Sequence, residues 1–162
     1  MGSTNSNINF YIDNRPLLDD YPTMQNFRGL ETGELGYIVN QTSNHWRKVF
    51  NVYAKLLFDW HQLNDRKDLP SCWQEYRDME LFQRHSQEAL LFSHPELNKN
   101  MDNIHIIAGK TYATALDLPP LIWLDSYFAI NKQHRIIVAP YPDYRQLSNE
   151  RIARLVVQMS SL

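Results

Sequence analysis

Two short apolar runs, each followed closely by a helix-forming stretch, constrain the fold of this 162-residue chain most strongly. The run IHIIAG (Ile104–Gly109) precedes KTYATALDL (Lys110–Leu118), and RIIVAP (Arg135–Pro140) precedes a loop and an amphipathic stretch that Ser148 caps. Apolar runs of this length, rich in β-branched residues, are typical of buried strands. Strands that alternate with helices form a largely parallel sheet. We therefore predict an α/β fold, a three-layer α/β/α sandwich whose mainly parallel sheet has four to five strands.

Hydrophobic periodicity predicts the other elements. Apolar residues recur at three- and four-residue steps over residues 44–63, which indicates a long amphipathic helix. The compact run LGYIV (Leu35–Val39) is typical of a buried strand. The remaining expected elements are a first or edge strand at Ile8–Asn14, a helix over 71–92, and two strands joined by a turn at 131–134. No repeat or linker divides the chain, so we expect a single domain over residues 1–162, with an irregular segment at 1–34.

Composition narrows the classes of function. The chain carries 16 Lys and Arg against 18 Asp and Glu, and this balance does not by itself indicate a nucleic-acid-binding protein. No apolar run approaches the roughly 18 residues of a membrane span. The polar start MGSTNSNIN lacks the apolar core of a secretory signal, and the single cysteine, Cys72, cannot form an internal disulfide. We therefore expect a cytoplasmic protein that does not enter a membrane.

Metal and cofactor motifs are missing from the sequence. The six histidines and one cysteine show neither HExxH nor CxxC spacing, so we expect no metal site. Gly109 and Lys110 match the end of a phosphate-binding Walker loop, but that loop needs a further glycine five residues before Gly109, inside the predicted strand, and none stands there. We expect no bound cofactor.

Positive charge gathers towards the C-terminus. Residues 132–154 hold five Lys and Arg against two acids, which forms either a solvated face or a basic edge. The helix that begins after Ser148 favours anions at its N-terminus, and Arg145 adds a fork of donors suited to phosphate or carboxylate. We therefore expect any bound anion near Arg145, unless Asp143 pairs with that arginine and makes the loop structural.

Ligands of parallel α/β sheets bind beyond the carboxyl ends of the strands. The predicted strand ends are followed by Asn40, by Gly109 and Lys110, and by Tyr141. We therefore expect Asn40 and Tyr141 to lie on the same edge of the sheet.

Three segments combine a predicted strand end with a helix start. They are GYIVNQ followed by SNHWRKVF (36–41 and 43–50), IIAGKTYATAL (106–116) and VAPYPDYRQLSNERIARL (138–155). In this order and spacing they resemble motifs of the uracil-DNA glycosylase superfamily, and its mismatch-specific branch most. The resemblance spans residues 35–162 and implies a uracil-DNA glycosylase-like sandwich.

The resemblance also implies residue roles. In such an enzyme Asn40 would position the attacking water, and Tyr141 would lie beside the leaving base. The chain departs from the family pattern because Gln41 replaces a proline, the loop that follows is short, and Asp143 stands in place of a serine, where a carboxylate repels a base anion. The implied catalytic residues are Asn40 and Tyr141. The implied ligand-binding residues are Gln41, Asn44, Lys110, Asp143, Arg145, Gln146 and Ser148.

These departures favour a catalytically silent relative that binds a nucleotide or nucleic acid in a cleft at the strand carboxyl ends. Two alternatives stay open. One is an interaction or structural module with no nucleic-acid role, and the other is a divergent DNA base glycosylase, an N-glycosidic hydrolase. The sequence does not determine the oligomeric state.

Overall fold

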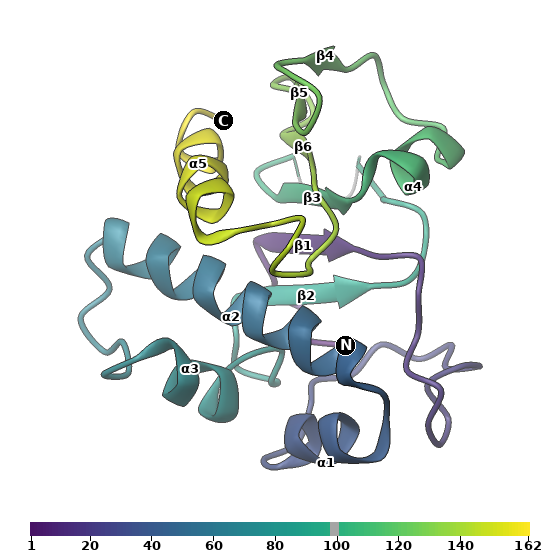
Figure 1. The fold of residues 1–162 in the computed structure, drawn as a ribbon, viewed down its shortest axis with the longest axis vertical. Coiled ribbons are helices and arrows are strands. Elements are labelled where there is room, and N and C mark those ends of the chain that lie inside the picture. Colours follow the sequence, from purple (N-terminus) through teal and green to yellow (C-terminus); the bar gives the residue numbers. More distant parts are fainter. Residues whose placement is uncertain (98–100) are drawn as a thin grey trace.

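The chain folds around a six-stranded mixed sheet with the strand order β2-β1-β3-β6-β5-β4 (Figure 1). The computed structural model describes residues 1–97 and 101–162. The strands are β1 (Ile8–Tyr11), β2 (Glu88–Leu91), β3 (Ile104–Ala108), β4 (Ile122–Trp123), β5 (Ala129–Asn131) and β6 (Ile136–Ala139). The helices are α1 (Glu34–Gln41), α2 (Asn44–Leu63), α3 (Trp73–Met79), α4 (Lys110–Ala115) and α5 (Asn149–Ser160).

Four neighbouring strands of this sheet, β2, β1, β3 and β6, run parallel, whereas β5 and β4 complete it in antiparallel fashion. The predicted α/β class is confirmed. The prediction of four to five strands is wrong, because the sheet has six, and its antiparallel third makes it mixed. The expected turn at 131–134 joins β5 to β6 as a hairpin, and Ile130 pairs with Ile137 across it.

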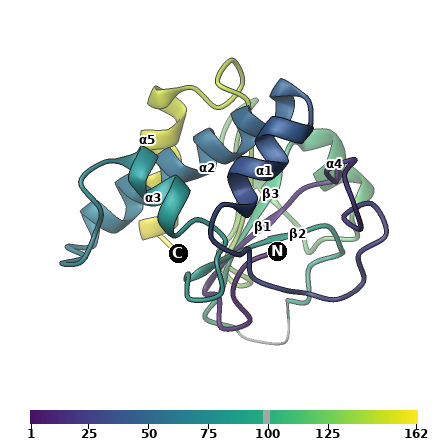
Figure 2. The same ribbon diagram turned by 90° about the horizontal axis from the view of Figure 1, so that it is seen from below.

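The two faces of the sheet are covered unequally. Figure 2 shows α1, α2, α3 and α5 gathered on one side of the strands. Phe10 of β1 points to that side and packs against Tyr53 of α2, with their ring centroids 4.2 Å apart. On the opposite face, Ala113 of α4 and Leu116, the residue that follows the helix, pack against Ile107 of β3 and its neighbours. The α4 helix has only six residues and contacts β3 and β6, so loops rather than a helical layer lie over β1 and β2.

Periodicity identified the two long helices correctly. The α2 helix spans the predicted range 44–63, because its apolar positions face β1 while polar positions face water. The α5 helix follows Ser148 as expected, with Ile152, Leu155 and Met159 buried on one face. Ser148 occupies the N-cap position but makes no side-chain hydrogen bond to the helix.

Two predicted elements are wrong. Residues 35–39 form most of α1 rather than a strand, and the helix buries Leu35 and Ile38, one turn apart. A run of five apolar residues fits either structure, and Gly33, in the left-handed region at φ 84°, begins the helix here. The predicted helix over 71–92 ends at Met79, because Phe82 adopts a φ of 56° and the chain then enters β2. The segment at 8–14 contains the first strand of the chain, as one of the two alternatives had it, and because β1 lies between β2 and β3 the edge-strand alternative is wrong.

A buried polar chain joins α2, α3 and β2. The Tyr76 hydroxyl donates to Glu88 Oε1 at 2.7 Å and lies 3.2 Å from His61 Nε2. Glu88 is fully buried, and burial raises the pKa of its carboxyl from 4.5 to about 7 despite these hydrogen bonds. Burial also lowers the pKa of His61 to about 4. The charged form of Glu88 therefore opposes folding above neutral pH.

We expect Glu88→Gln to remove a pH dependence of stability. Because the folded-state pKa of Glu88 exceeds the unfolded value, the folded protein binds the extra proton, and the contribution of Glu88 to stability falls as pH rises from 4.5 to about 7. His61 and His105, whose pKa values are lowered, contribute in the opposite direction, and equally in wild type and variant, so the difference between the two proteins reports Glu88. The loss amounts to about 3 kcal/mol over this range. Urea unfolding at several pH values, with the exposed Glu75→Gln as control, measures it. An unchanged pH slope in Glu88→Gln would contradict the assignment.

Gly29 lies in a loop that packs against Arg84, in the segment before β2, and Gly36 in α1 provides a control for a stability test of this contact. A Cβ at Gly29 would lie 2.4 Å from the backbone nitrogen of Arg84, whereas a Cβ at Gly36 in α1 meets nothing within 4 Å. We expect Gly29→Ala to lower the free energy of unfolding by about 1–3 kcal/mol. Gly36→Ala should raise it by up to about 1 kcal/mol, because alanine favours the helix. Equal effects in thermal unfolding would show that the Gly29 contact is dispensable.

Candidate functional site

The carboxyl ends of the parallel strands form the candidate site. After β1 the chain passes to α1 and α2 on one face, and after β3 it passes to α4 on the other face. The strand order therefore reverses between β1 and β3, and ligands of open α/β sheets bind at such a switch point. The segments 12–15, 109–112 and 140–145 meet at this edge.

Tyr141, two residues beyond β6, lies at the centre of this edge. Its hydroxyl lies 2.8 Å from Nε2 of His45 in the first turn of α2, and it accepts a hydrogen bond from Asn14 Nδ2 at 3.2 Å. Partial burial raises the pKa of Tyr141, and the carboxylates of Asp13 and Asp143 add to this. Burial, helped by the charge of Lys48, lowers the pKa of His45. Both rings are therefore uncharged at neutral pH and share one hydrogen bond.

Gly109 allows the end of β3 to approach this cluster. Its φ of 96° is in the region that favours glycine, and its N–H donates to Ala139 O at 2.8 Å. A Cβ at this position would lie 4.0 Å from the Tyr141 ring, so backbone conformation rather than space requires glycine here. Burial raises the pKa of Tyr112 on α4, and the Asp13 carboxylate adds to this, as it does for Tyr141.

The loop between β6 and α5 is braced by its own acid. Asp143 pairs with Lys48 of α2 at 2.9 Å and accepts the backbone N–H of Arg145 at 2.9 Å. The hydrogen bond from Arg145 N–H and the pairing with Lys48 lower the pKa of Asp143. The Arg145 guanidinium instead lies 5.7 Å from the ring centroid of Tyr144. Asp143 therefore neutralises Lys48 and leaves the exposed Arg145 side chain beside an exposed aromatic ring.

Three exposed aromatic rings on this side of the molecule each have a cation over them. Lys110 Nζ lies 4.6 Å from the Trp123 centroid, and the Arg151 guanidinium lies 3.7 Å from that of Tyr127. The third ring is Tyr144, with Lys48 at 5.0 Å as well as Arg145. The β5–β6 register pairs Ala129 with Val138, so the loop between β4 and β5 lies at the edge where β6 ends. The cation–aromatic pairs therefore lie at the same edge of the sheet as Tyr141. We call this edge, formed by the segments 12–15, 109–112 and 140–145, the Tyr141 edge.

Comparison with known proteins identifies the family. The model of DUF6942, a family of unknown function, matches residues 1–160. The chain belongs to the DUF6942 family. No curated protein and no solved structure matches the chain. The match to DUF6942 includes all the helices and strands described above, so the Tyr141 edge is part of the family domain.

The structure of this DUF6942 protein brings some predicted site residues together and separates others. Lys110, Asp143 and Arg145 lie at the Tyr141 edge. The carbonyl oxygen of Gln146 accepts a hydrogen bond from Arg151. Asn44 is exposed and begins α2. Asn40 and Gln41 do not follow a strand, because they end α1. Asn40 lines a cavity of about 380 Å³ together with Arg47 and Arg77, whereas Tyr141 has His45 and Asn14 as partners. The prediction placed Asn40 and Tyr141 together because both would follow strands, and this reason is wrong because Asn40 lies in a helix.

Sequence reasoning missed His45, Lys48 and Asn14. His45 and Lys48 are three residues apart at the start of a correctly predicted helix, so helical spacing places them on one face. That signal was available, although nothing in the sequence says that this face meets Tyr141. Asn14 carried no signal, because its role depends on β1 being an interior strand beside β3.

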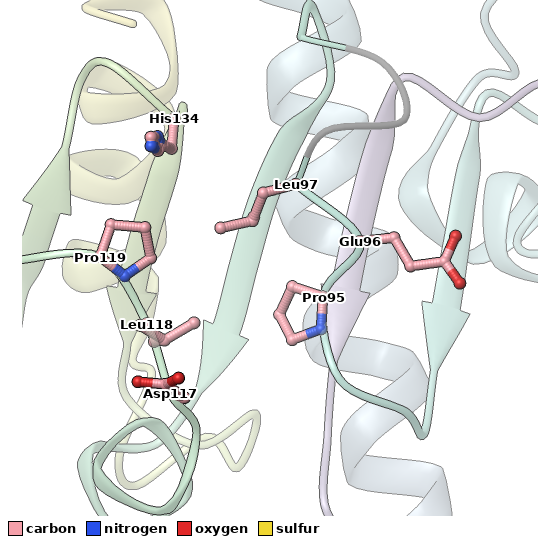
Figure 3. Close-up of a pocket in the computed structure, with 7 residues that line it drawn as sticks. All are labelled: Pro95, Glu96, Leu97, Asp117, Leu118, Pro119 and His134. Carbon is pink, nitrogen blue, oxygen red and sulfur yellow. The ribbon is translucent and has the colours of Figure 1, made fainter.

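Cavities occupy the thinly covered face of the sheet in this DUF6942 protein. One, of about 800 Å³, lies between Pro95–Leu97 and Asp117–Pro119, with His134 at one end (Figure 3). Another, of about 620 Å³, lies over β1, β2 and the start of β3. Among residues 1–97 and 101–162, no group of three or more His, Cys, Asp or Glu side chains could hold a metal ion. None of the helices in those ranges is long and apolar enough to cross a membrane.

Proposed function

We propose that this DUF6942 protein binds a nucleotide or nucleic acid at the Tyr141 edge and does not excise a base. The three exposed cation–aromatic pairs, at Trp123, Tyr127 and Tyr144, carry this proposal. Proteins that hold single-stranded nucleic acid use aromatic faces on which bases stack and cations that follow the phosphates. Both kinds of group occur together at the edge where α/β sheets hold ligands.

Local charge supports the proposal better than net charge does. Acids already neutralise part of the basic segment, because Asp125 pairs with Arg154 and Asp143 pairs with Lys48. Lys110, Arg145 and Arg151 remain as the cations over exposed rings. Lys110 and Arg145 can each move from a ring to a phosphate while the freed ring stacks with a base, and such a rearrangement costs little at an exposed pair. Arg151 would also have to release its hydrogen bond to Gln146 O.

The first of the three glycosylase-like matches lies on a different element from the one predicted. Residues 106–116 and 138–155 do combine a strand end with a helix, β3 with α4 and β6 with α5, and these two matches continue to favour the proposed relationship. Residues 36–41 are helical, so Asn40 is not held at a strand end to position water. The hydrolase hypothesis thereby loses its water-positioning residue, and binding without catalysis is the function we favour.

An interaction module without a nucleic-acid role is favoured by one specific observation. Ile122 of β4 is 68% exposed, and Leu124 beside it is also exposed. β4 is the terminal strand of the described sheet, and an exposed apolar edge strand is suited to pairing with another protein chain. Binding of an oligonucleotide, tested below, separates the two functions.

We expect a labelled single-stranded oligonucleotide of about 15 nucleotides to bind in a salt-sensitive manner. Trp123→Ala should weaken binding about fivefold or more, because a stacked base contributes at least about 1 kcal/mol. Arg145→Ala and Arg151→Ala should weaken it and reduce the dependence on salt, because each removes a phosphate contact. Fluorescence anisotropy at low and moderate salt measures these effects.

Arg47→Ala is the matched control, because Arg47 is an exposed arginine of α2 that lines the cavity beside α1 instead. Its binding curve should equal that of the wild type. Equal curves for all four variants, or no binding at low salt, would refute the proposal and favour the interaction module.

We expect no base release from uracil-containing or mismatched duplexes. Asn40 is in α1, and the Asp143 carboxylate near Tyr141 opposes the charge of a departing base anion. The measurement is strand cleavage at abasic sites after incubation with a large excess of protein. Release that Tyr141→Phe abolishes while the fold is retained would instead establish a divergent glycosylase.

A further inference from the structure

We propose that the thinly covered face of the sheet carries a second binding site, which takes an uncharged nitrogen heterocycle of the pyrimidine or purine class. The site is the cavity of about 620 Å³ over β1, β2 and the start of β3. It does not depend on the Tyr141 edge. Its volume is in the range of pockets that bury small ligands.

The topology of the sheet creates this cavity. The short α4 helix covers β3 and β6, so none of the helices in the described ranges lies above the side chains that β1 and β2 direct to this face. Asn9, Tyr11, Ala89 and Leu91 form part of the cavity lining, and Phe27 belongs to its wall. The site therefore has a floor of strands, and strands hold side chains more rigidly than loops do.

Polar groups are built into the floor although it is buried. Asn9 is 6% exposed and His105 is 2% exposed, and the two residues are register partners in neighbouring strands. Ser6 Oγ donates to Asn9 Oδ1 at 2.7 Å, and the Tyr11 hydroxyl lies 2.8 Å from His105 Nδ1. Burial lowers the pKa of His105 to about 4, so the ring is neutral at pH 7. These bonds hold uncharged donors and acceptors in fixed positions.

One acceptor in the lining has no partner. Asn103 lines the cavity, and its Oδ1 is buried without a hydrogen bond. A buried acceptor that stays unpaired costs about 1–3 kcal/mol, so native proteins seldom keep one without a purpose. A ligand N–H that reached Oδ1 would recover this cost. Asn103 therefore specifies a donor on the ligand.

The lining also restricts the charge of the ligand. Neither lysine nor arginine occurs among the described residues around the cavity, and Glu96 adds a carboxylate to its lining, so a phosphate or carboxylate would enter without a counter-charge. Amide, hydroxyl and neutral imidazole groups suit a molecule that offers both donors and acceptors. Phe27 and Leu91 supply apolar surface for a flat ring. A heterocyclic base combines these properties.

The test is a titration of isotope-labelled protein with uracil and with hypoxanthine, followed by two-dimensional NMR to about 10 mM ligand. We expect saturable shifts of the Asn9, Tyr11 and His105 amides with at least one of the two bases, and no shifts there with inorganic phosphate. Shifts confined to Lys110 and Tyr141, equal shifts with phosphate, or no shifts would overturn the proposal. Oligonucleotide binding at the Tyr141 edge is measured separately, so either site can fail without the other.

Asn103→Leu separates binding from folding. It removes an unpaired acceptor, so we expect an equal or higher melting temperature together with an affinity at least tenfold lower. The control is Asn131→Leu, which removes bonds to Pro120 O and His134 N and should lower the melting temperature while binding persists. Ser93→Trp, at the exposed rim, provides a second variant that should block the cavity. Unchanged affinity in both Asn103→Leu and Ser93→Trp would refute the site.

Discussion

The packing of α2 against β1 is the interaction on which the rest of the structure depends. Phe10, in an interior strand, contacts Tyr53 of α2, and Phe82 meets both rings edge-on just before β2. This aromatic contact sets the position of a 20-residue helix that serves several sites. The first turn of α2 brings His45 and Lys48 to the Tyr141 edge, and its last turn brings His61 to the buried Glu88 chain.

Unequal coverage of the sheet explains where polar chemistry occurs in this molecule. The face beneath α2 and α5 is closed by apolar side chains from strands and helices. In the part of the chain that the structure describes, the opposite face has one short helix, and there the strands carry Asn9 and His105 among their buried residues. Burying polar groups is costly unless they are hydrogen-bonded, which is why these two residues have partners within the fold. The thin layer leaves room for the cavities that adjoin them.

The Tyr141 edge and the floor of the sheet are suited to different ligands for electrostatic reasons. At the edge, cations lie over exposed rings in water, where they can exchange a ring for a phosphate. On the floor, the polar groups are neutral and desolvated, and an anion would have no compensation there. Local pairing decides which charges are available to a ligand. The Asp143 carboxylate, for example, is already paired with Lys48 and accepts a backbone N–H.

The sequence by itself determined the elements with a distinctive local pattern: the amphipathic repeats of α2 and α5, the β-branched apolar run of β3 and the turn of the β5–β6 hairpin. It could not decide residues 35–39 or 88–91, because short apolar runs suit a helix or a strand equally. Packing on α2 made the first a helix, and pairing with β1 made the second a strand. The Tyr141 cluster was likewise decided by tertiary structure. Asn14 and His45 are 127 and 96 residues from Tyr141, and only the placing of β1 and β6 on either side of β3 brings these side chains within hydrogen-bonding distance.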